Sequence, residues 1–159
     1  MWLTKKILVA TDFGEPSRAA AEVGLQLAQK FQVPLVLVHA YMVPGAIYMA
    51  FPTMPAVDYP RIYEEAARES LEKEGSRLAR RGAEVTTMLR AGVAWEQILV
   101  TAKEVDADLI VVGTHGRRGV PRALLGSVAE KVVRLSPVPV LTIHAGPETE
   151  EKTSDESVT

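Results

Sequence analysis

The chain of 159 residues contains no cysteine. Disulfide bonds, thiolate nucleophiles and cysteine-ligated zinc or iron–sulfur centres are therefore excluded. An excess of charge of either sign is also missing, because the formal net charge is only -2 at pH 7. Proteins that bind nucleic acids usually carry a strongly basic face, so we expect no nucleic-acid partner.

Long uninterrupted apolar segments are missing as well. The residues after Met1 lead into a short apolar run that is too brief for the core of a secretory signal. Residues 35–57 lack Asp, Glu, Lys and Arg, but three prolines and a glycine interrupt them. A membrane-spanning helix needs about 20 apolar residues that can stay helical. We therefore expect a cytoplasmic protein with no membrane-spanning segment.

Short apolar runs and amphipathic segments alternate along the chain. Runs typical of buried parallel strands lie at residues 6–11, 33–40, 83–89, 108–112 and 138–143, and the third of them fits a sheet edge. Helical spacing separates these runs. The alternation predicts a single α/β domain with a doubly wound, Rossmann-like sheet of five parallel strands in the order 3-2-1-4-5. We expect this domain over residues 1–145 and a disordered acidic tail over 146–159.

Apolar residues at spacings of three and four predict which side of each helix faces the core. The predicted core-facing residues are Ala20, Val23, Leu27 and Phe31; Tyr63, Ala67, Leu71 and Leu78; Trp95, Ile98, Leu99, Ala102 and Val105; and Val128, Val132 and Leu135.

A glycine-spaced loop follows the fourth expected strand. Gly113-Thr-His-Gly116 comes first, three arginines follow, and Gly126-Ser127 opens the next helix. Glycine lets backbone N–H groups approach an anion, and a helix N-terminus offers free N–H groups and the positive end of its dipole. The segment therefore meets the needs of phosphate binding. The same glycines could serve only a tight strand-to-helix connection, and that alternative stays open.

The motifs of several other nucleotide-binding and hydrolytic proteins are absent. The chain has no Gly-x-x-x-x-Gly-Lys-Ser/Thr P-loop, no Gly-x-Gly-x-x-Gly after its first strand and no Gly-x-Ser-x-Gly elbow. A P-loop NTPase, a dinucleotide-binding domain and an α/β-hydrolase are therefore not indicated.

The spacing Gly113-x2-Gly116-x9-Gly126-Ser127 resembles the nucleotide-binding signature of the universal stress protein family. The resemblance includes Asp12 after the first strand, the Leu-Val-His-Ala that ends at Ala40, and the closing Pro-Val-Pro-Val-Leu, and it covers residues 4–144. It implies ATP as ligand, accompanied by magnesium. Many relatives have a serine where this chain has Gly14, so the first helix is expected to lack that cap.

The resemblance also implies a role for each matching residue. Asp12 would contact the ribose or the magnesium-bound phosphates, with Thr11 beside it, and the backbone of Ala40 would meet the adenine edge. The ribose and phosphates would lie against Gly113, His115, Gly116 and Arg117. The phosphates would bind the N–H and hydroxyl groups of Gly126, Ser127 and Val128.

Simpler interpretations compete at some of these positions. Asp12 could only cap the turn before the first helix. His39 fits a satisfied core histidine, whereas His115 lies in the glycine loop and is as easily functional as structural. The three histidines lack metal-ligand spacing. A long loop over Met42 to Val57 fits either a lid on the nucleotide or an apolar flap on the fold.

The function predicted is that of an ATP-binding regulatory protein in a stress response, which signals to an unknown protein partner. The alternatives are a slow ATP hydrolase or a phosphoryl or adenylyl transferase, and a structural dimer with an empty loop. Neither Asp12 nor His115 has an evident orienting partner, so efficient turnover is not predicted. We also expect a homodimer through Val138 to Ile143, because an apolar edge strand invites pairing through Leu141 and Ile143, with Pro139 blunting it only in part.

Overall fold

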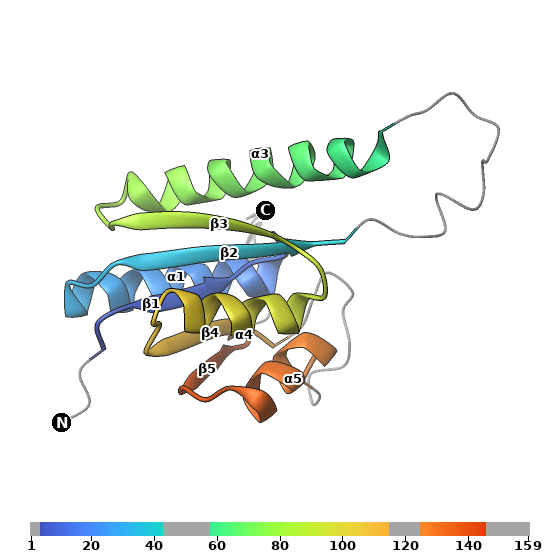
Figure 1. The fold of residues 1–159 in the computed structure, drawn as a ribbon. Coiled ribbons are helices and arrows are strands. Elements are labelled where there is room, and N and C mark those ends of the chain that lie inside the picture. Colours follow the sequence, from blue (N-terminus) through green and yellow to red (C-terminus); the bar gives the residue numbers. More distant parts are fainter. Residues whose placement is uncertain (1–3, 43–57, 115–124, 146–159) are drawn as a thin grey trace, which may run out of the picture.

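The computed structural model describes residues 4–42, 58–114 and 125–145. The long loop after Met42, residues 115–124 of the glycine loop and the acidic tail lie outside these described residues. The predicted site residues His115, Gly116 and Arg117 are among them. The elements are β1 (Ile7–Ala10), α1 (Glu15–Phe31), β2 (Leu35–Tyr41), α3 (Tyr59–Ala79), β3 (Val85–Ala91), α4 (Ala94–Glu104), β4 (Leu109–Gly113), α5 (Ser127–Leu135) and β5 (Val140–Ile143). Figure 1 shows their arrangement.

The strands form one parallel sheet in the order β3-β2-β1-β4-β5, which confirms the predicted fold class and strand order. Ile7 of the central strand β1 is in register with Leu35 of β2 and with Leu109 of β4. The chain proceeds outward to one side through β2 and β3, then returns to the other side through β4. The carboxyl ends of β1 and β4 therefore flank the point where ligands bind in such sheets.

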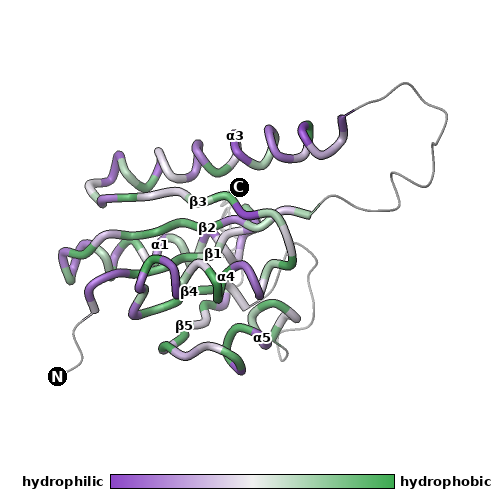
Figure 2. Tube along the Cα trace, viewed as in Figure 1, coloured by the Kyte–Doolittle hydropathy of each residue, from purple (hydrophilic) through white to green (hydrophobic). Residues whose placement is uncertain are grey.

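Helices cover both faces of the sheet, and each face has its own core. Ile7 and Val9 of β1 pack under α1 and α3, whereas Leu8 between them packs under α4 and α5. All three are fully buried. Buried strands between helical layers explain the continuous apolar runs in the sequence, which are coloured green through the centre of Figure 2.

Helix α1 presents to the sheet only part of the face that was predicted, since Ala20 is buried and Leu27 packs against the core as expected. Its buried residues include Ala20, Gly24 and Leu25, whereas Phe31 is 48% exposed. A Cβ on Gly24 would lie 2.4 Å from Val9 Cγ2, so at this position the helix lies too close to β1 for any side chain. The small residues decide the orientation of the helix, and the prediction from the large apolar residues was wrong for Phe31.

The apolar stripes of the other helices are confirmed in part. On α4, Ile98 and Ala102 are buried as predicted. On α5, Val132 is buried together with Ala129, but Leu135 is 48% exposed. The predicted inward-facing Val128, Leu135 and Tyr63 are all exposed. Tyr63 and Val128 lie near the first residues of their helices and Leu135 is the last residue of α5, and periodicity alone does not reveal that helix ends are less covered than helix centres.

Strand β5 lies at one edge of the sheet, as expected, but its free edge differs from the prediction. The carbonyl of Pro139 accepts the N–H of Ile110, and the carbonyl of Ile143 accepts the N–H of Thr114. Because neighbouring residues of a strand direct their backbone groups to opposite sides, Val140 and Thr142 face outward. The prediction that Leu141 and Ile143 supply the unpaired donors and acceptors of this edge was therefore wrong. Pro139 does not blunt the outer edge either, because the N–H that it lacks would point toward β4.

Candidate functional site

A cavity opens at the carboxyl ends of the central strands, and the described residues around it enclose about 160 Å³. Four segments that are far apart in sequence contribute to it: the ends of β1, β2 and β4, and the first turn of α5, with part of α4 beside them. The lining residues are Ala10, Thr11, Asp12, Ser17, Val38, His39, Ala40, Ala94, Ile98, Val112, Gly113, Thr114, Gly126, Ser127, Val128 and Ala129.

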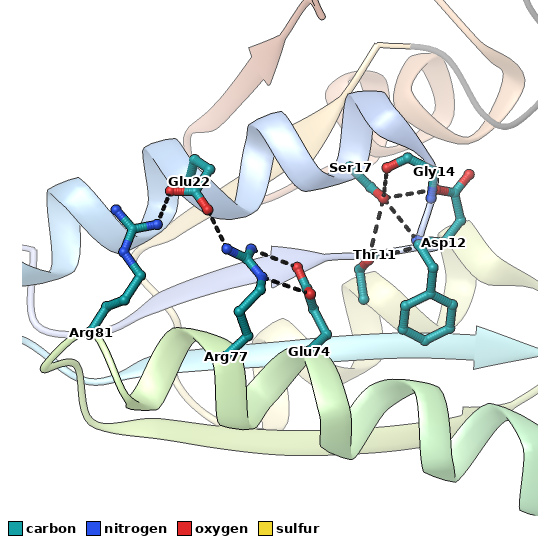
Figure 3. A network of polar contacts seen from close by, with 9 residues as sticks. Thr11, Asp12, Gly14, Ser17, Glu22, Glu74, Arg77 and Arg81 are labelled. Carbon is teal, nitrogen blue, oxygen red and sulfur yellow. Dashed lines mark hydrogen bonds and ion pairs between the residues drawn. The ribbon is translucent and has the colours of Figure 1, made fainter.

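The turn between β1 and α1 is held by a network around Asp12 (Figure 3). Asp12 Oδ1 accepts the N–H of Gly14 at 2.9 Å and the hydroxyl of Ser17 at 2.8 Å. Gly14 is the N-cap of α1 and has no side chain to cap the helix, as expected from the sequence. Asp12 and Ser17 close the turn in its place. Asp12 therefore caps this turn, as one of the two interpretations predicted. Its carboxylate also borders the cavity.

Phe13 takes an unusual backbone conformation in this turn. Its φ is +64°, in the left-handed region that bulky residues rarely enter. Its N–H donates to Thr11 Oγ1 at 3.0 Å, and its ring lies 4.4 Å from the His39 ring, centroid to centroid. His39 Nδ1 is 2.7 Å from the carbonyl oxygen of Thr11. His39 is thus satisfied, as predicted, but it is half-buried and borders the cavity.

Gly113 ends β4 beneath the first turn of α1. A Cβ at this position would lie 2.7 Å from the carbonyl carbon of Pro16, closer than real side chains allow. Glycine is required here for close packing. The next residue, Thr114, is fully buried, and its hydroxyl lies 3.0 Å from His144 Nδ1. Its carbonyl accepts the N–H of Gly126, which brings the start of α5 to the end of β4.

Helix α5 begins at the cavity with its N-terminus open. Its N-cap, Gly126, has an extended backbone and makes no side-chain capping bond. The first N–H groups of a helix have no partner within the helix, and the helix dipole places partial positive charge there. Ser127, Val128 and Ala129 therefore present an uncapped, positively polarised helix end to the cavity.

Seven of the predicted site residues surround this single cavity, although the chain brings them from four separate places. They are Thr11, Asp12, Ala40, Gly113, Gly126, Ser127 and Val128. His115, Gly116 and Arg117 lie outside the described ranges. Ser17 and Thr114 also line the cavity and were missed from the sequence. Their positions after β1 and β4 were a usable signal, because polar residues at strand ends gather at one edge of a parallel sheet.

The cavity combines an apolar side with a polar side. Val38, Ile98 and Val112 provide an apolar surface against which a flat ring can pack, and Thr11 and Asp12 are polar. The helix end at Ser127 suits an anion. Among the described residues, no group of three or more His, Asp or Glu could hold a metal ion by itself. In the same parts of the chain, no helix is both long and apolar enough to cross a membrane.

Comparison with known proteins identifies the family. The model of the universal stress protein family matches residues 4–144. The chain belongs to this family. Among curated members, universal stress protein MJ0531 of Methanocaldococcus jannaschii is 32% identical over 142 residues, which cover 89% of this chain and 82% of the relative.

Solved structures of universal stress proteins share the fold. One is a universal stress protein in complex with cAMP, with a TM-score of 0.69 and 25% identity, covering 91% of this chain and 100% of that one. Another is the universal stress protein of Archaeoglobus fulgidus in complex with dAMP, with a TM-score of 0.61 and 26% identity, covering 89% and 99% of the two chains.

Proposed function

We propose that this universal stress protein binds ATP in the cavity at the ends of β1 and β4, and that it acts as a regulatory protein in a stress response. The observation that carries the proposal is the uncapped N-terminus of α5, which shares a cavity with Asp12 and with the apolar ends of β2 and β4. The adenine nucleotides bound by related structures, cAMP and dAMP, support the choice of ligand class.

In this proposal the apolar side of the cavity binds the adenine ring and the polar side binds the phosphates. The adenine ring packs on the apolar surface near Val38 and Ile98, with the backbone of Ala40 at its edge. The phosphates bind the N–H groups of Ser127 and Val128 at the start of α5. This orientation gives each part of ATP the environment that its polarity requires.

Magnesium accompanies ATP in this proposal. Mg²⁺ usually keeps several water ligands and needs one or two carboxylates besides the phosphates. The Asp12 carboxylate fits that need because it borders the cavity while Oδ1 is held in place by Gly14 and Ser17. When bound, the ion would neutralise phosphate charge, and Asp12 would orient it.

Signalling in this proposal passes through a homodimer formed at β5. Among the described residues only β4 pairs with β5, and the backbone groups of Val140 and Thr142 face the other side. A second copy pairing there would cover an edge that proteins normally protect. The dimer surface then lies next to α5, whose N-terminus we assign to the phosphates.

Calorimetric titration of the protein with ATP and magnesium tests the binding site. We expect micromolar dissociation, about -8 kcal/mol. Ser127→Asp adds a negative charge that suits the helix N-terminus but repels phosphate, so it should preserve the fold and weaken ATP binding about tenfold or more. Ser127→Asn, which has nearly the same shape without the charge, is the control. Absence of binding heat in the wild type, or equal affinity in the two variants, would contradict the proposal.

A further inference from the structure

A second hollow lies between α1 and α3, on the sheet face opposite α4 and α5. Its volume is about 610 Å³. We call it the α1–α3 groove, and it is lined by Phe13, Arg18, Glu22, Ser70, Lys73, Glu74, Arg77 and Arg80. On α3, the lining residues recur every three or four positions and so share one face of the helix.

The floor of the groove is an ion-pair network with no net charge (Figure 3). Arg77 donates to Glu74 at 2.8 and 2.9 Å and to Glu22 at 2.5 Å. Arg81 also pairs with Glu22. Two arginines and two glutamates balance, and they join α1 to α3. Glu74 is 8% exposed, and the charges of these four side chains are paired with one another within the network.

The rim of the groove carries positive charge that the described residues do not neutralise. Arg18, Lys73 and Arg80 are all exposed and line the groove, and none has an acidic partner in the described parts of the chain. Three cations around one groove make a local positive potential in a protein whose formal charge is -2. Such a groove suits a ligand with several carboxylates.

The chain itself contains a segment whose negative charge is complementary to the positive rim of the groove. Residues 146–159 hold five acidic residues and one lysine, a net charge of -4, which leaves +2 on the rest of the chain. We propose that the acidic segment 148–156 binds in the α1–α3 groove of its own chain, with its carboxylates on Arg18, Lys73 and Arg80. The proposal does not depend on nucleotide binding.

The segment leaves the fold close enough to reach the groove. Strand β5 ends at Ile143, in register with Gly113 at the carboxyl edge of the sheet, and Gly113 packs on the first turn of α1. Phe13, at one end of the groove, follows β1 at that same edge. The path crosses the width of α1, about 10 Å. An extended chain spans this distance in about three to four residues, so a segment that follows this path would enter the groove near residue 148.

Zero-length carbodiimide cross-linking followed by mass spectrometry tests this contact in the full chain. The reagent joins a lysine to a carboxylate only when the two touch, and Lys73 is the lysine of the groove. We expect amide bonds from Lys73 to Glu148, Glu150, Glu151, Asp155 or Glu156. The exposed Lys103 on α4, at the opposite face, is the internal control and should give none.

A matched pair of variants shows whether the groove charges cause the contact. Arg18→Gln combined with Arg80→Gln keeps Lys73 but removes two rim charges, so the yield at Lys73 should fall about threefold. Arg134→Gln, on α5, removes an arginine from the other face and should leave the yield unchanged. In about 0.5 M salt the Debye length is only about 4 Å, and the wild-type yield should fall as well.

Mixing isotope-labelled and unlabelled chains identifies the source of the acidic segment. Cross-links within one chain support the proposal, whereas mixed-isotope cross-links would assign the segment to a second copy and overturn it. Equal yields at Lys73 and Lys103, cross-links to Lys131 of α5, or none at all would also overturn it.

Discussion

Gly113 at the end of β4 and Pro16 in the first turn of α1 lie in direct backbone contact. A Cβ on Gly113 would be 2.7 Å from the Pro16 carbonyl carbon and 2.8 Å from its oxygen. This contact holds the β1–α1 turn, and with it Asp12, beside the strand end from which the chain continues to α5. The shape of the candidate site therefore depends on a glycine that needs no unusual φ.

Gly113→Ala should destabilise the protein by about 1–3 kcal/mol, because the added methyl meets backbone that cannot rotate away. Gly75→Ala is the matched control. Its Cβ would meet only the side-chain methyl of Thr87, on edge strand β3, at 2.4 Å. We expect a smaller loss there and unchanged nucleotide affinity. Urea denaturation measures both, and equal losses would show that the Gly113 contact is not special.

Asp12 combines a structural and a proposed ligand-binding role, and two substitutions separate them. Asp12→Asn keeps an oxygen that can accept from Gly14 and Ser17, so stability should stay within about 0.5 kcal/mol while affinity for magnesium-ATP falls. Asp12→Ala removes the acceptor and should also cost about 1–2 kcal/mol. Thermal unfolding and calorimetry with and without magnesium measure the two effects. If Asp12→Asn binds magnesium-ATP like the wild type, the proposed role of its charge is wrong.

The carboxyl group of Glu22 makes the free energy of unfolding depend on pH in the acidic range. Burial raises the pKa of its carboxyl, but hydrogen bonds from Arg77 and Arg81 outweigh burial, so the pKa in the folded protein lies below 4.5. The stabilisation is therefore present above pH 4.5 and lost as the pH falls through the lowered pKa. Because these side chains are about one-third exposed, the effect should be below about 1 kcal/mol.

Denaturant unfolding at neutral pH and at a pH below the lowered pKa of Glu22 measures this pH dependence. Glu22→Gln should lower the free energy of unfolding at neutral pH and make it less sensitive to acid. Glu104→Gln, which removes the exposed partner of Arg90, is the control for an ion pair elsewhere. Identical acid profiles for wild type and Glu22→Gln would contradict the prediction.

The proposed dimer can be broken without breaking the sheet. Thr142→Pro removes an outward-facing N–H and should give a folded monomer, because the β4 ladder does not use that donor. Leu141→Pro removes a donor on the β4 side and should destabilise the fold itself. Light scattering gives the mass, and circular dichroism checks folding. A wild-type monomer, or a folded Thr142→Pro dimer, would place the interface elsewhere.

ATP hydrolysis, if present, should be slow, well below the roughly 10 per second typical of enzymes. Asp12 Oδ1 is committed to the turn, where it accepts from Gly14 and Ser17. A phosphate-release assay measures the rate. Rapid multiple turnover that disappears in Asp12→Asn would favour the hydrolase alternative over the regulatory protein.

The strand order and the gathering of Asp12, Ala40 and Gly126 could be predicted because they follow from local pattern and a general rule. Apolar runs that alternate with helical spacing produce a doubly wound parallel sheet, and its strand ends meet at one edge. The polar residues after β1 and β4 therefore had to lie together. The glycine spacing before α5 identified the same place from a resemblance to the family.

The orientation of α1 could not be predicted from periodicity, because contact distance decided it. Large residues such as Phe31 gave the stronger apolar signal, yet Gly24 and its small neighbours form the face that touches β1. The contact of Thr114 with His144, which lies 30 residues further along the chain, likewise depends on the tertiary structure.

By itself the sequence determined the fold class, the strand order, the absence of cysteine chemistry and the position of the glycine loop, since each is a property of residues close together in the chain or of composition. Only the tertiary structure decided that Gly113 serves packing, that Val140 and Thr142 form the free edge of β5, and that Arg18, Lys73 and Arg80 share one groove. These depend on distances and directions between segments far apart in sequence, which local periodicity does not contain.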